Sequence, residues 1–211
     1  KLPSFFSVHE KNQLYKLHMS RNYWSLIDID SEFQTEEMCK NAVKHQYCLN
    51  LQYVINKTQT ICDIAVEYNV ESIQFVDEKF QNEKMCEYVV KHKYSYPKSS
   101  NIGSHKNIAP YVKFQTEEIC KMMLTNNRCV QCEGNNLQYI HEKFRTDEMC
   151  KLAIDNGFCS VLPKHCELLT TNALAYAIRK RKDIFYRIPE HLRTDELKAI
   201  YDSLFVHKTY I

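Results

Sequence analysis

Ten cysteines give this 211-residue chain its most obvious capacity for chemistry. An even number of cysteines can indicate a disulfide framework, and closely spaced pairs can hold a metal ion. Half of these cysteines, however, occupy the same place in a recurring phrase, which runs from a small polar residue through polar residues and one apolar residue to the cysteine. These five are Cys39, Cys62, Cys86, Cys120 and Cys150. Their regular placement favours a structural role over a chemical one.

A C-x-x-C pair, Cys129 and Cys132, lies within an inserted loop. Two thiolates at this spacing would supply half of a tetrahedral zinc site. Three further residues are conceivable completing ligands: Cys159, His165 and Cys166. One C-x-x-C among ten cysteines is a weak signal, and Cys129 also has a repeat-derived place nine residues after Cys120. We therefore expect no metal or other cofactor, and we keep a zinc-binding protein as an alternative.

One basic run, Arg179-Lys180-Arg181-Lys182, is followed closely by Arg187. Such a cluster can contact phosphates, which makes a nucleic-acid-associated protein using residues 179–193 a second alternative. Acidic residues dilute the run, and Lys or Arg at the end of a helix also interacts favourably with the helix dipole. We favour a solvated helix end.

Residues 95–110 form an insertion that interrupts the regular spacing. Insertions in repeat proteins map to loops on one face, which is often the binding face. The candidate partner-binding residues there are Tyr96, Lys98, His105 and Lys106. A tolerated loop without a function is the competing interpretation.

The sequence lacks the common catalytic motifs: a Gly-rich phosphate loop, H-E-x-x-H and G-x-S-x-G. Paired acids such as Glu36-Glu37 resemble catalytic carboxylates in isolation, but they recur at the start of successive phrases. We expect no catalytic residues and predict that the protein is not an enzyme.

The phrases that carry the cysteines recur at intervals that indicate a repeat protein. Those starting at Thr35, Thr58 and Asn82 are 23 and 24 residues apart, and the next two follow after 34 and 30 residues. Each such unit must be a small element of structure that stacks on its neighbours. With weaker copies at both ends, we count about eight repeats, beginning near residues 11, 35, 58, 82, 116, 146, 170 and 194, with insertions near 95–110 and 130–136.

Each phrase predicts an amphipathic helix. With the small polar residue as position zero, the apolar residues fall at +3, +4, +7 and +8, which lie on one stripe of a 3.6-residue period. In the second repeat these are Met38, Cys39, Ala42 and Val43. The residue at zero can cap the helix, and the acids after it suit the positive end of the helix dipole. A second apolar phrase, such as Leu51-Gln52-Tyr53-Val54, predicts a short second helix, although four residues do not exclude a strand.

The spacing therefore predicts an all-α fold: one domain over residues 1–211, a right-stacked α-helical solenoid of two-helix repeats of about 24 residues. Parallel neighbouring helices lie about 8–10 Å apart, whereas a disulfide needs Cα atoms within about 7 Å. We expect reduced, buried thiols and an intracellular location. Polar Lys198 and Asp202 stand where other repeats are apolar, which indicates a C-terminal capping repeat.

The phrase T-E-E-M-C-K-N-A-V followed by N-L-Q-Y-V resembles the short helical repeats of unknown function that abound in mimivirus-like giant viruses and also occur in some bacteria. The resemblance covers residues 33–160 well and both ends poorly. It implies a scaffold for protein contacts, located in the host-cell cytoplasm or virus factory if the chain is viral, and it brings no catalytic residues.

Composition restricts the partners. A formal net charge of +2 argues against a uniformly acidic or basic partner. No run approaches the roughly 18 apolar residues that a membrane span needs. We thus predict a non-catalytic scaffold that binds a protein partner, with nucleic acid as a weaker alternative and no membrane partner.

Overall fold

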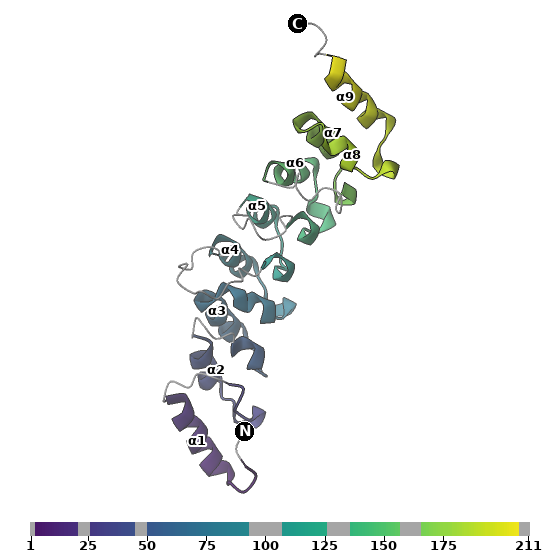
Figure 1. Cartoon of the computed structure of the whole chain (residues 1–211). Coiled ribbons are helices and arrows are strands. Elements are labelled where there is room, and N and C mark those ends of the chain that lie inside the picture. Colours follow the sequence, from purple (N-terminus) through teal and green to yellow (C-terminus); the bar gives the residue numbers. More distant parts are fainter. Residues whose placement is uncertain are drawn as a thin grey trace. The chain divides into compact units, whose positions relative to one another are not determined.

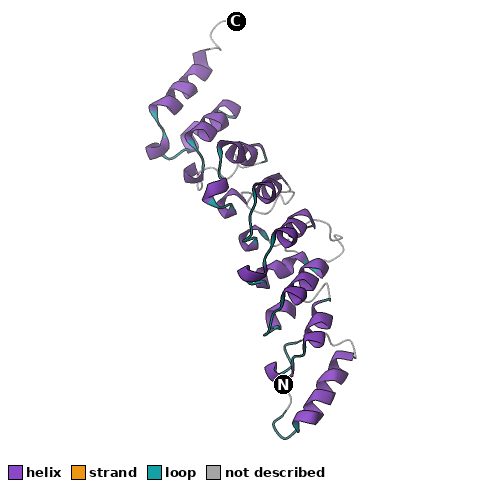
Figure 2. Cartoon of the chain, turned by 180° about the vertical axis from the view of Figure 1, so that it is seen from behind, coloured by secondary structure: helices purple, strands orange, loops and turns teal. Residues whose placement is uncertain are grey.

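The computed structural model describes residues 3–20, 26–44, 50–92, 107–125, 136–156 and 166–206, although not the side chains of 18–20, 205 and 206. Within these ranges the chain is helical and contains no strand, which confirms the predicted all-α class (Figures 1 and 2). The chain divides into two compact units. The N-terminal unit comprises Lys1–Ser99 and Tyr111–Phe114, and the C-terminal unit comprises Ser100–Pro110 and Gln115–Ile211.

The N-terminal unit contains four α-helices and several 3₁₀ turns among its described residues. The α-helices are α1 (Val8–Ser20), α2 (Glu36–Val43), α3 (Gln59–Tyr68) and α4 (Glu83–His92). The 3₁₀ turns are η1 (Ser31–Phe33), η2 (Asn50–Tyr53), η3 (Val70–Phe75) and η4 (Glu78–Phe80). A further turn, η5 (Ala109–Tyr111), contains residues of both units.

The C-terminal unit repeats this alternation. Its described α-helices are α5 (Glu117–Thr125), α6 (Asp147–Asp155), α7 (Thr171–Lys180), α8 (Ile184–Arg187) and α9 (Asp195–Val206). Its 3₁₀ turns are η6 (Asn136–Tyr139), η7 (Glu142–Phe144), η10 (Cys166–Leu168) and η11 (Glu190–Leu192).

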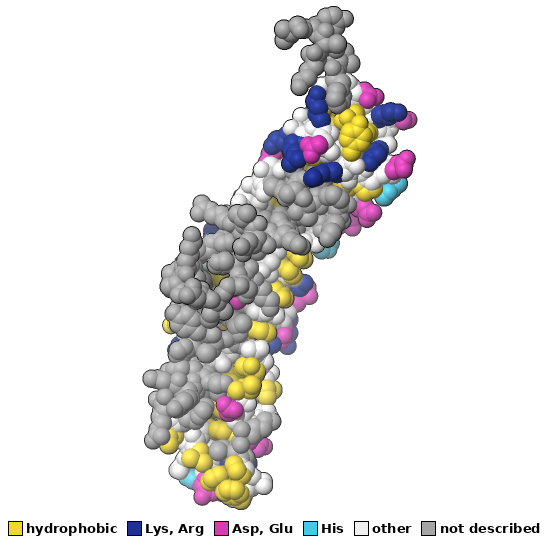
Figure 3. Space-filling model, viewed as in Figure 1, with side chains coloured by type: hydrophobic (Ala, Val, Ile, Leu, Met, Phe, Trp, Pro, Cys, Tyr) yellow, Lys and Arg dark blue, Asp and Glu magenta, His cyan; other side chains and the backbone are white. Residues whose placement is uncertain are grey.

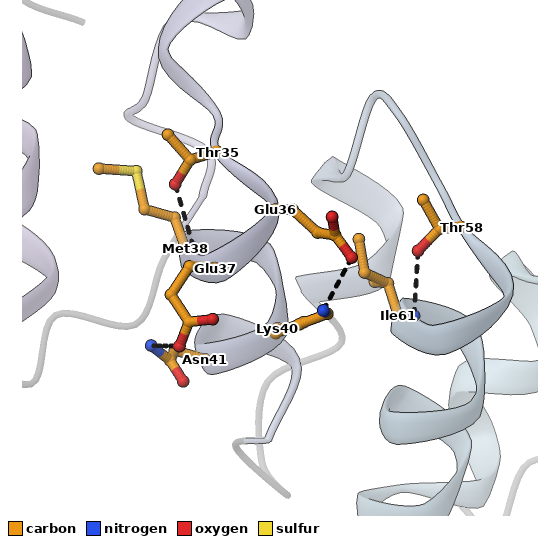
Figure 4. Close-up of polar contacts among 8 residues, drawn as sticks. All are labelled: Thr35, Glu36, Glu37, Met38, Lys40, Asn41, Thr58 and Ile61. Carbon is orange, nitrogen blue, oxygen red and sulfur yellow. Dashed lines mark hydrogen bonds and ion pairs between the residues drawn. The ribbon is translucent and has the colours of Figure 1, made fainter.

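The predicted helix caps are confirmed from the second repeat onward. Thr35 Oγ1 accepts a hydrogen bond from the backbone N–H of Met38 at 3.3 Å, and Thr58 does the same for Ile61 (Figure 4). The remaining caps are Asn82, Thr116, Thr146, Thr170 and Thr194. A cap of this kind typically contributes about 1 kcal/mol.

The predicted apolar stripe is also confirmed. In α2, Met38, Cys39, Ala42 and Val43 are all buried, and the corresponding positions of α3 to α6 are buried as well. Helices this short are marginal alone, so burial of this stripe must supply most of their stability. The six cysteines in the described ranges are all buried free thiols.

The second apolar phrase of a repeat forms a helical element and not a strand, the two possibilities that its short length had left open. After α7 it is the four-residue α-helix α8, whereas after α2 and α5 it is a 3₁₀ turn, η2 and η6. In both turns the first residue is a buried asparagine that bonds to the preceding helix. Asn50 Nδ2 donates to the carbonyl of Ala42 at 2.8 Å, and Asn136 Nδ2 donates to that of Met123 at 2.7 Å. These bonds satisfy carbonyl groups near helix ends that lack an intrahelical partner.

A glutamine immediately before the cap joins one repeat to the next. Gln81 Nε2 donates to the carbonyl of Tyr111 at 2.9 Å, and its Oε1 accepts from the backbone N–H of Lys113 at 2.9 Å. Gln34 makes the same pair of bonds to Tyr53 and Ile55, and Gln115 to Tyr139 and His141. In each case the two backbone groups are two residues apart, so the glutamine fixes the register of the following repeat.

The first helix begins earlier than predicted. The cap is Ser7 and not Lys11, because Ser7 Oγ accepts from the N–H of Glu10 at 3.3 Å while a Glu10 carboxylate oxygen accepts from the N–H of Ser7 at 2.8 Å. This reciprocal capping box sets the start of α1 at Val8. With Ser7 as zero, Tyr15 at +8 is buried while Leu14 at +7 is 36% exposed.

In the last helix, α9, two positions of the stripe that are buried in α2 to α6 are exposed. With Thr194 as zero, Leu197 at +3 is buried, whereas Lys198 at +4 and Asp202 at +8 are exposed. Positions +4 and +8 therefore bear polar side chains only where they meet water, as a capping helix requires. Whether all the repeats form one continuous solenoid stays a prediction.

Candidate functional site

Most of the residues proposed for a zinc site lie outside the described residues: Cys129, Cys132, Cys159 and His165. Cys166 is described, in η10, where its side chain is buried and burial raises the pKa of its thiol. Among the described residues, no group of three His, Cys, Asp or Glu side chains could hold a metal ion. The candidate partner-binding residues Tyr96, Lys98, His105 and Lys106 also lie outside the described residues.

The basic run lies at the C-terminal end of α7, and three of its four side chains have partners within the C-terminal unit. Lys180 pairs with Asp155 of α6 and lies 5.3 Å from the centroid of the Tyr176 ring. Arg181 makes two bonds to the Asp183 carboxylate, at 2.7 and 3.2 Å, and Lys182 donates to the carbonyl of Leu204 in α9.

These contacts shift the titration of the acids involved. A hydrogen bond from Lys180 lowers the pKa of Asp155, and one from Arg181 lowers the pKa of Asp183. Exposed ion pairs of this kind stabilise a protein only weakly. Arg179 and Arg187 are exposed. The arrangement agrees better with a solvated helix end than with a continuous row of cations directed at phosphates.

Next to the basic run lies an aromatic cluster that the sequence analysis did not identify. Phe185 and Tyr186 come from α8, and Tyr201 comes from α9. The rings of Phe185 and Tyr201 are stacked, with centroids 4.4 Å apart and an interplanar angle of 16°. The ring of Tyr186 meets both edge-on, at 5.7 Å from Phe185 and 5.3 Å from Tyr201. Only the adjacent pair Phe185-Tyr186 after a basic run could have pointed to this cluster, because Tyr201 joins it from another helix.

Hydrogen bonds fix the orientation of this cluster. Tyr201 Oη donates to Tyr186 Oη at 2.8 Å, and this bond is the main reason that the pKa of Tyr201 is raised to about 12. Arg193 donates from Nε to the carbonyl of Ile188 at 2.8 Å and from Nη2 to that of Tyr186 at 2.9 Å. Its guanidinium carbon lies 5.5 Å from the centroid of the Phe185 ring. The cluster is thus held by hydrogen bonds and ring contacts, with an arginine at its side.

Figure 3 shows one face of this region. Lys and Arg side chains surround a group of hydrophobic side chains at the part of the C-terminal unit where α8 and α9 lie, with a few acidic side chains nearby. Tyr186 is 65% exposed, whereas Phe185 beneath it is buried. Tyr201 and Arg193 are half-buried beside Tyr186. We call the surface formed by Tyr186, Tyr201 and Arg193 the Tyr186 patch.

None of the helices in the described ranges combines the length and the apolar character that a bilayer crossing demands.

No protein-family model, curated protein or solved structure matches the chain. The resemblance to giant-virus repeats therefore remains an expectation drawn from the residue pattern, and the fold described above is the basis for any functional proposal.

Proposed function

We propose that the protein is a non-catalytic helical-repeat scaffold that binds another protein. One observation supports this proposal most directly: the buried position +4 of successive repeats is uniform, whereas the half-buried position +6 is diverse. Position +4 is a buried cysteine in α2 to α6. Position +6 is half-buried in each helix from α2 to α7, and its residues share no chemistry: Asn41, Ile64, Tyr88, Met122, Leu152 and Tyr176.

The physical reason for the contrast is packing. An inward position must fill the space against a neighbouring helix, so its size and polarity are fixed by the fold. Position +6 meets this requirement only in part, since it is half-buried and Tyr88 and Tyr176 donate to Glu67 and Asp155 of the preceding helix. Its exposed part can be matched to a partner. A surface that mixes aromatic, aliphatic and amide side chains suits a protein partner better than a polyanion, which would favour a row of cations.

The state of the thiols supports a role without covalent catalysis. Burial raises the pKa of Cys62, Cys86 and Cys120 to about 11. The thiolate is the reactive form of cysteine, so such thiols are poor nucleophiles near neutral pH. Unpaired buried thiols are typical of an intracellular protein, and we extend the proposal to that location: the host-cell cytoplasm or virus factory if the protein is viral.

The two alternatives have less support. For nucleic acid, the internal contacts of Lys180, Arg181 and Lys182 leave fewer cations directed outward. For zinc, the C-x-x-C pair lies outside the described residues, and Cys166 alone offers one buried thiol.

The test uses the full chain as bait in an extract of the cells that naturally make it. We expect recovery of a protein at constant stoichiometry, retained after nuclease treatment. The outward variant Met122→Lys/Leu152→Lys should lose that protein. A matched control, Thr125→Lys/Asn156→Lys, adds the same two charges to the ends of α5 and α6 and should retain it, with circular dichroism confirming that both variants are folded. Loss of the captured material after nuclease treatment, or equal capture by both variants, would refute the proposal.

A further inference from the structure

Tyr186 combines high exposure with a fixed position. Its side chain is 65% exposed. Its hydroxyl is nevertheless bonded to Tyr201 at 2.8 Å, its ring is held edge-on by two neighbouring rings, and its carbonyl is bonded by Arg193. A side chain that is already ordered loses little conformational entropy when a partner covers it. Rigid exposed tyrosines of this kind serve as anchors in protein-binding surfaces.

The hydroxyl of Tyr186 has hydrogen-bonding capacity left over. In the bond between the two phenols, Tyr201 donates and Tyr186 accepts. A phenol has one proton to donate. The proton of Tyr186 is therefore available for an acceptor on a partner, and a carboxylate oxygen is the strongest acceptor that a protein side chain offers.

Arg193 adds a positive charge beside this hydroxyl. Two of its N–H groups donate to backbone carbonyls, of Ile188 and Tyr186. A guanidinium carries five such groups in a planar fork that matches a carboxylate. Those two bonds and the Phe185 ring hold the guanidinium in place, and the carbonyls are neutral acceptors that do not cancel its charge.

The charges around the patch favour a negatively charged partner. Arg179 and Arg187 are exposed nearby in the sequence, and Figure 3 shows Lys and Arg side chains, with some Asp and Glu, on the face of the C-terminal unit where α8 and α9 lie. Of the nearby acids, Asp183 is paired with Arg181 and Asp155 with Lys180, whereas Glu190 and Asp202 are exposed. An exposed aromatic group beside the Arg193 guanidinium is complementary to a segment that carries both carboxylates and an apolar side chain.

We propose that the Tyr186 patch binds an acidic segment of a partner protein, with Tyr186 packing against an apolar side chain and Arg193 pairing with a carboxylate. Tyrosine and arginine are the residue types that most often dominate the binding energy of protein interfaces. This inference rests on the proposed function, and it names the surface and the chemistry of the partner.

The probe is a fluorescein-labelled peptide of alternating glutamate and phenylalanine, titrated with the full chain and followed by fluorescence anisotropy. The comparison probes are the same peptide with glutamine in place of glutamate, and single-stranded oligothymidylate. We expect the acidic peptide to bind, the glutamine peptide to bind much more weakly, and added oligothymidylate not to compete.

Variants locate the binding. Tyr186→Ala should weaken it at least about tenfold, as expected for an interface anchor, and Tyr186→Phe, which keeps the ring but loses the proton, should have an intermediate effect. Tyr68→Ala, which removes a tyrosine that is 43% exposed in the N-terminal unit, is the matched control and should bind like the unaltered chain.

Three results would overturn this inference: no binding of the acidic peptide, equal binding of the glutamine peptide, or equal binding by Tyr186→Ala. Competition by oligothymidylate would show that the patch binds nucleic acid, which would overturn the proposal of an acidic protein segment. If the extract experiment recovers a partner that Tyr186→Ala still binds, the scaffold function stands and this site for it is refuted.

Discussion

The thiol of Cys86 donates a hydrogen bond to the side-chain amide oxygen of Gln81, with the two atoms 3.4 Å apart. The same oxygen accepts from the backbone of Lys113, and the amide nitrogen donates to the carbonyl of Tyr111. Cys120 and Gln115 are related in the same way at 3.6 Å. The recurrent cysteine therefore completes a buried polar contact between repeats, in addition to filling space.

Replacing this glutamine should destabilise the fold. Gln81→Leu keeps the size of the side chain but removes its hydrogen bonds to the carbonyl of Tyr111 and the N–H of Lys113. An unsatisfied buried polar group typically costs about 1–3 kcal/mol. Urea unfolding of the variant should show a lower midpoint, while Gln52→Leu, at an exposed position of η2, should change it little. Equal midpoints for the two variants would show that the contact between repeats contributes nothing.

The buried asparagine at the start of η6 should be similarly sensitive. Asn136 is buried, donates to the carbonyl of Met123 and accepts from Asn107 Nδ2 at 3.1 Å. We expect Asn136→Ala to lower the free energy of unfolding by about 1–3 kcal/mol, because the carbonyl of Met123 loses its partner. Gln138→Ala, two residues on and only half-buried, is the control for thermal unfolding. A loss no larger than that of the control would contradict the assigned role.

A charge on the inward stripe should unfold the chain. Ala42 is fully buried in α2, so Ala42→Asp places a carboxylate among apolar side chains, at a cost of several kcal/mol that is comparable to the whole stability of a typical domain. Lys40→Asp on the same helix replaces the 2.8 Å ion pair with Glu36 by a weak repulsion between two carboxylates (Figure 4). Exposed pairs contribute at most about 1 kcal/mol. Circular dichroism should show loss of helix in the first variant alone, and similar spectra for both would rule out the helical stripe.

Stability should fall as the solution becomes alkaline. Burial raises the pKa of the Cys62, Cys86 and Cys120 thiols from the ordinary value of 9.0 to about 11. Between these values the unfolded chain loses protons that the folded chain retains, so the contribution of the protonated thiols is complete below pH 9 and is lost as the pH rises toward 11. Urea midpoints measured with a reductant between pH 8 and 11 should decrease.

The variant Cys86→Ala provides the comparison for this pH dependence. It is less stable at pH 8 because of the cavity that it creates, but its midpoint should decrease less steeply with pH, since one of the shifted thiols is gone. An identical slope in the variant and the unaltered chain would show that Cys86 ionises as freely in the folded state as in the unfolded one.

The parts of this fold that the sequence predicts are those governed by local spacing. A cap and four apolar positions within nine residues determine a helix and its buried side, and from Thr35 onward both were predicted correctly. The same reasoning failed at the first helix, where Ser7 and Glu10 form a capping box that lies outside the repeat template.

Contacts between residues far apart in the sequence could not be predicted in this way. Gln81 reaches backbone groups 30 and 32 residues ahead, across the insertion. Tyr201 meets Tyr186 only because α9 packs on α8. The basic run could contact phosphates as a sequence pattern, but in the structure Lys180 pairs with Asp155 and Arg181 pairs with Asp183. Such partners depend on how helices pack, which a pattern within one repeat does not contain.

The measurement that tests this account most directly is pulsed alkylation of the native, reduced chain, followed by peptide mapping. Cys39, Cys62, Cys86, Cys120 and Cys150 are buried in helices packed against their neighbours, so we predict that all five stay unlabelled until a denaturant unfolds the chain. Rapid labelling of these cysteines in the native chain, or their recovery as disulfides, would contradict the stacked-helix architecture.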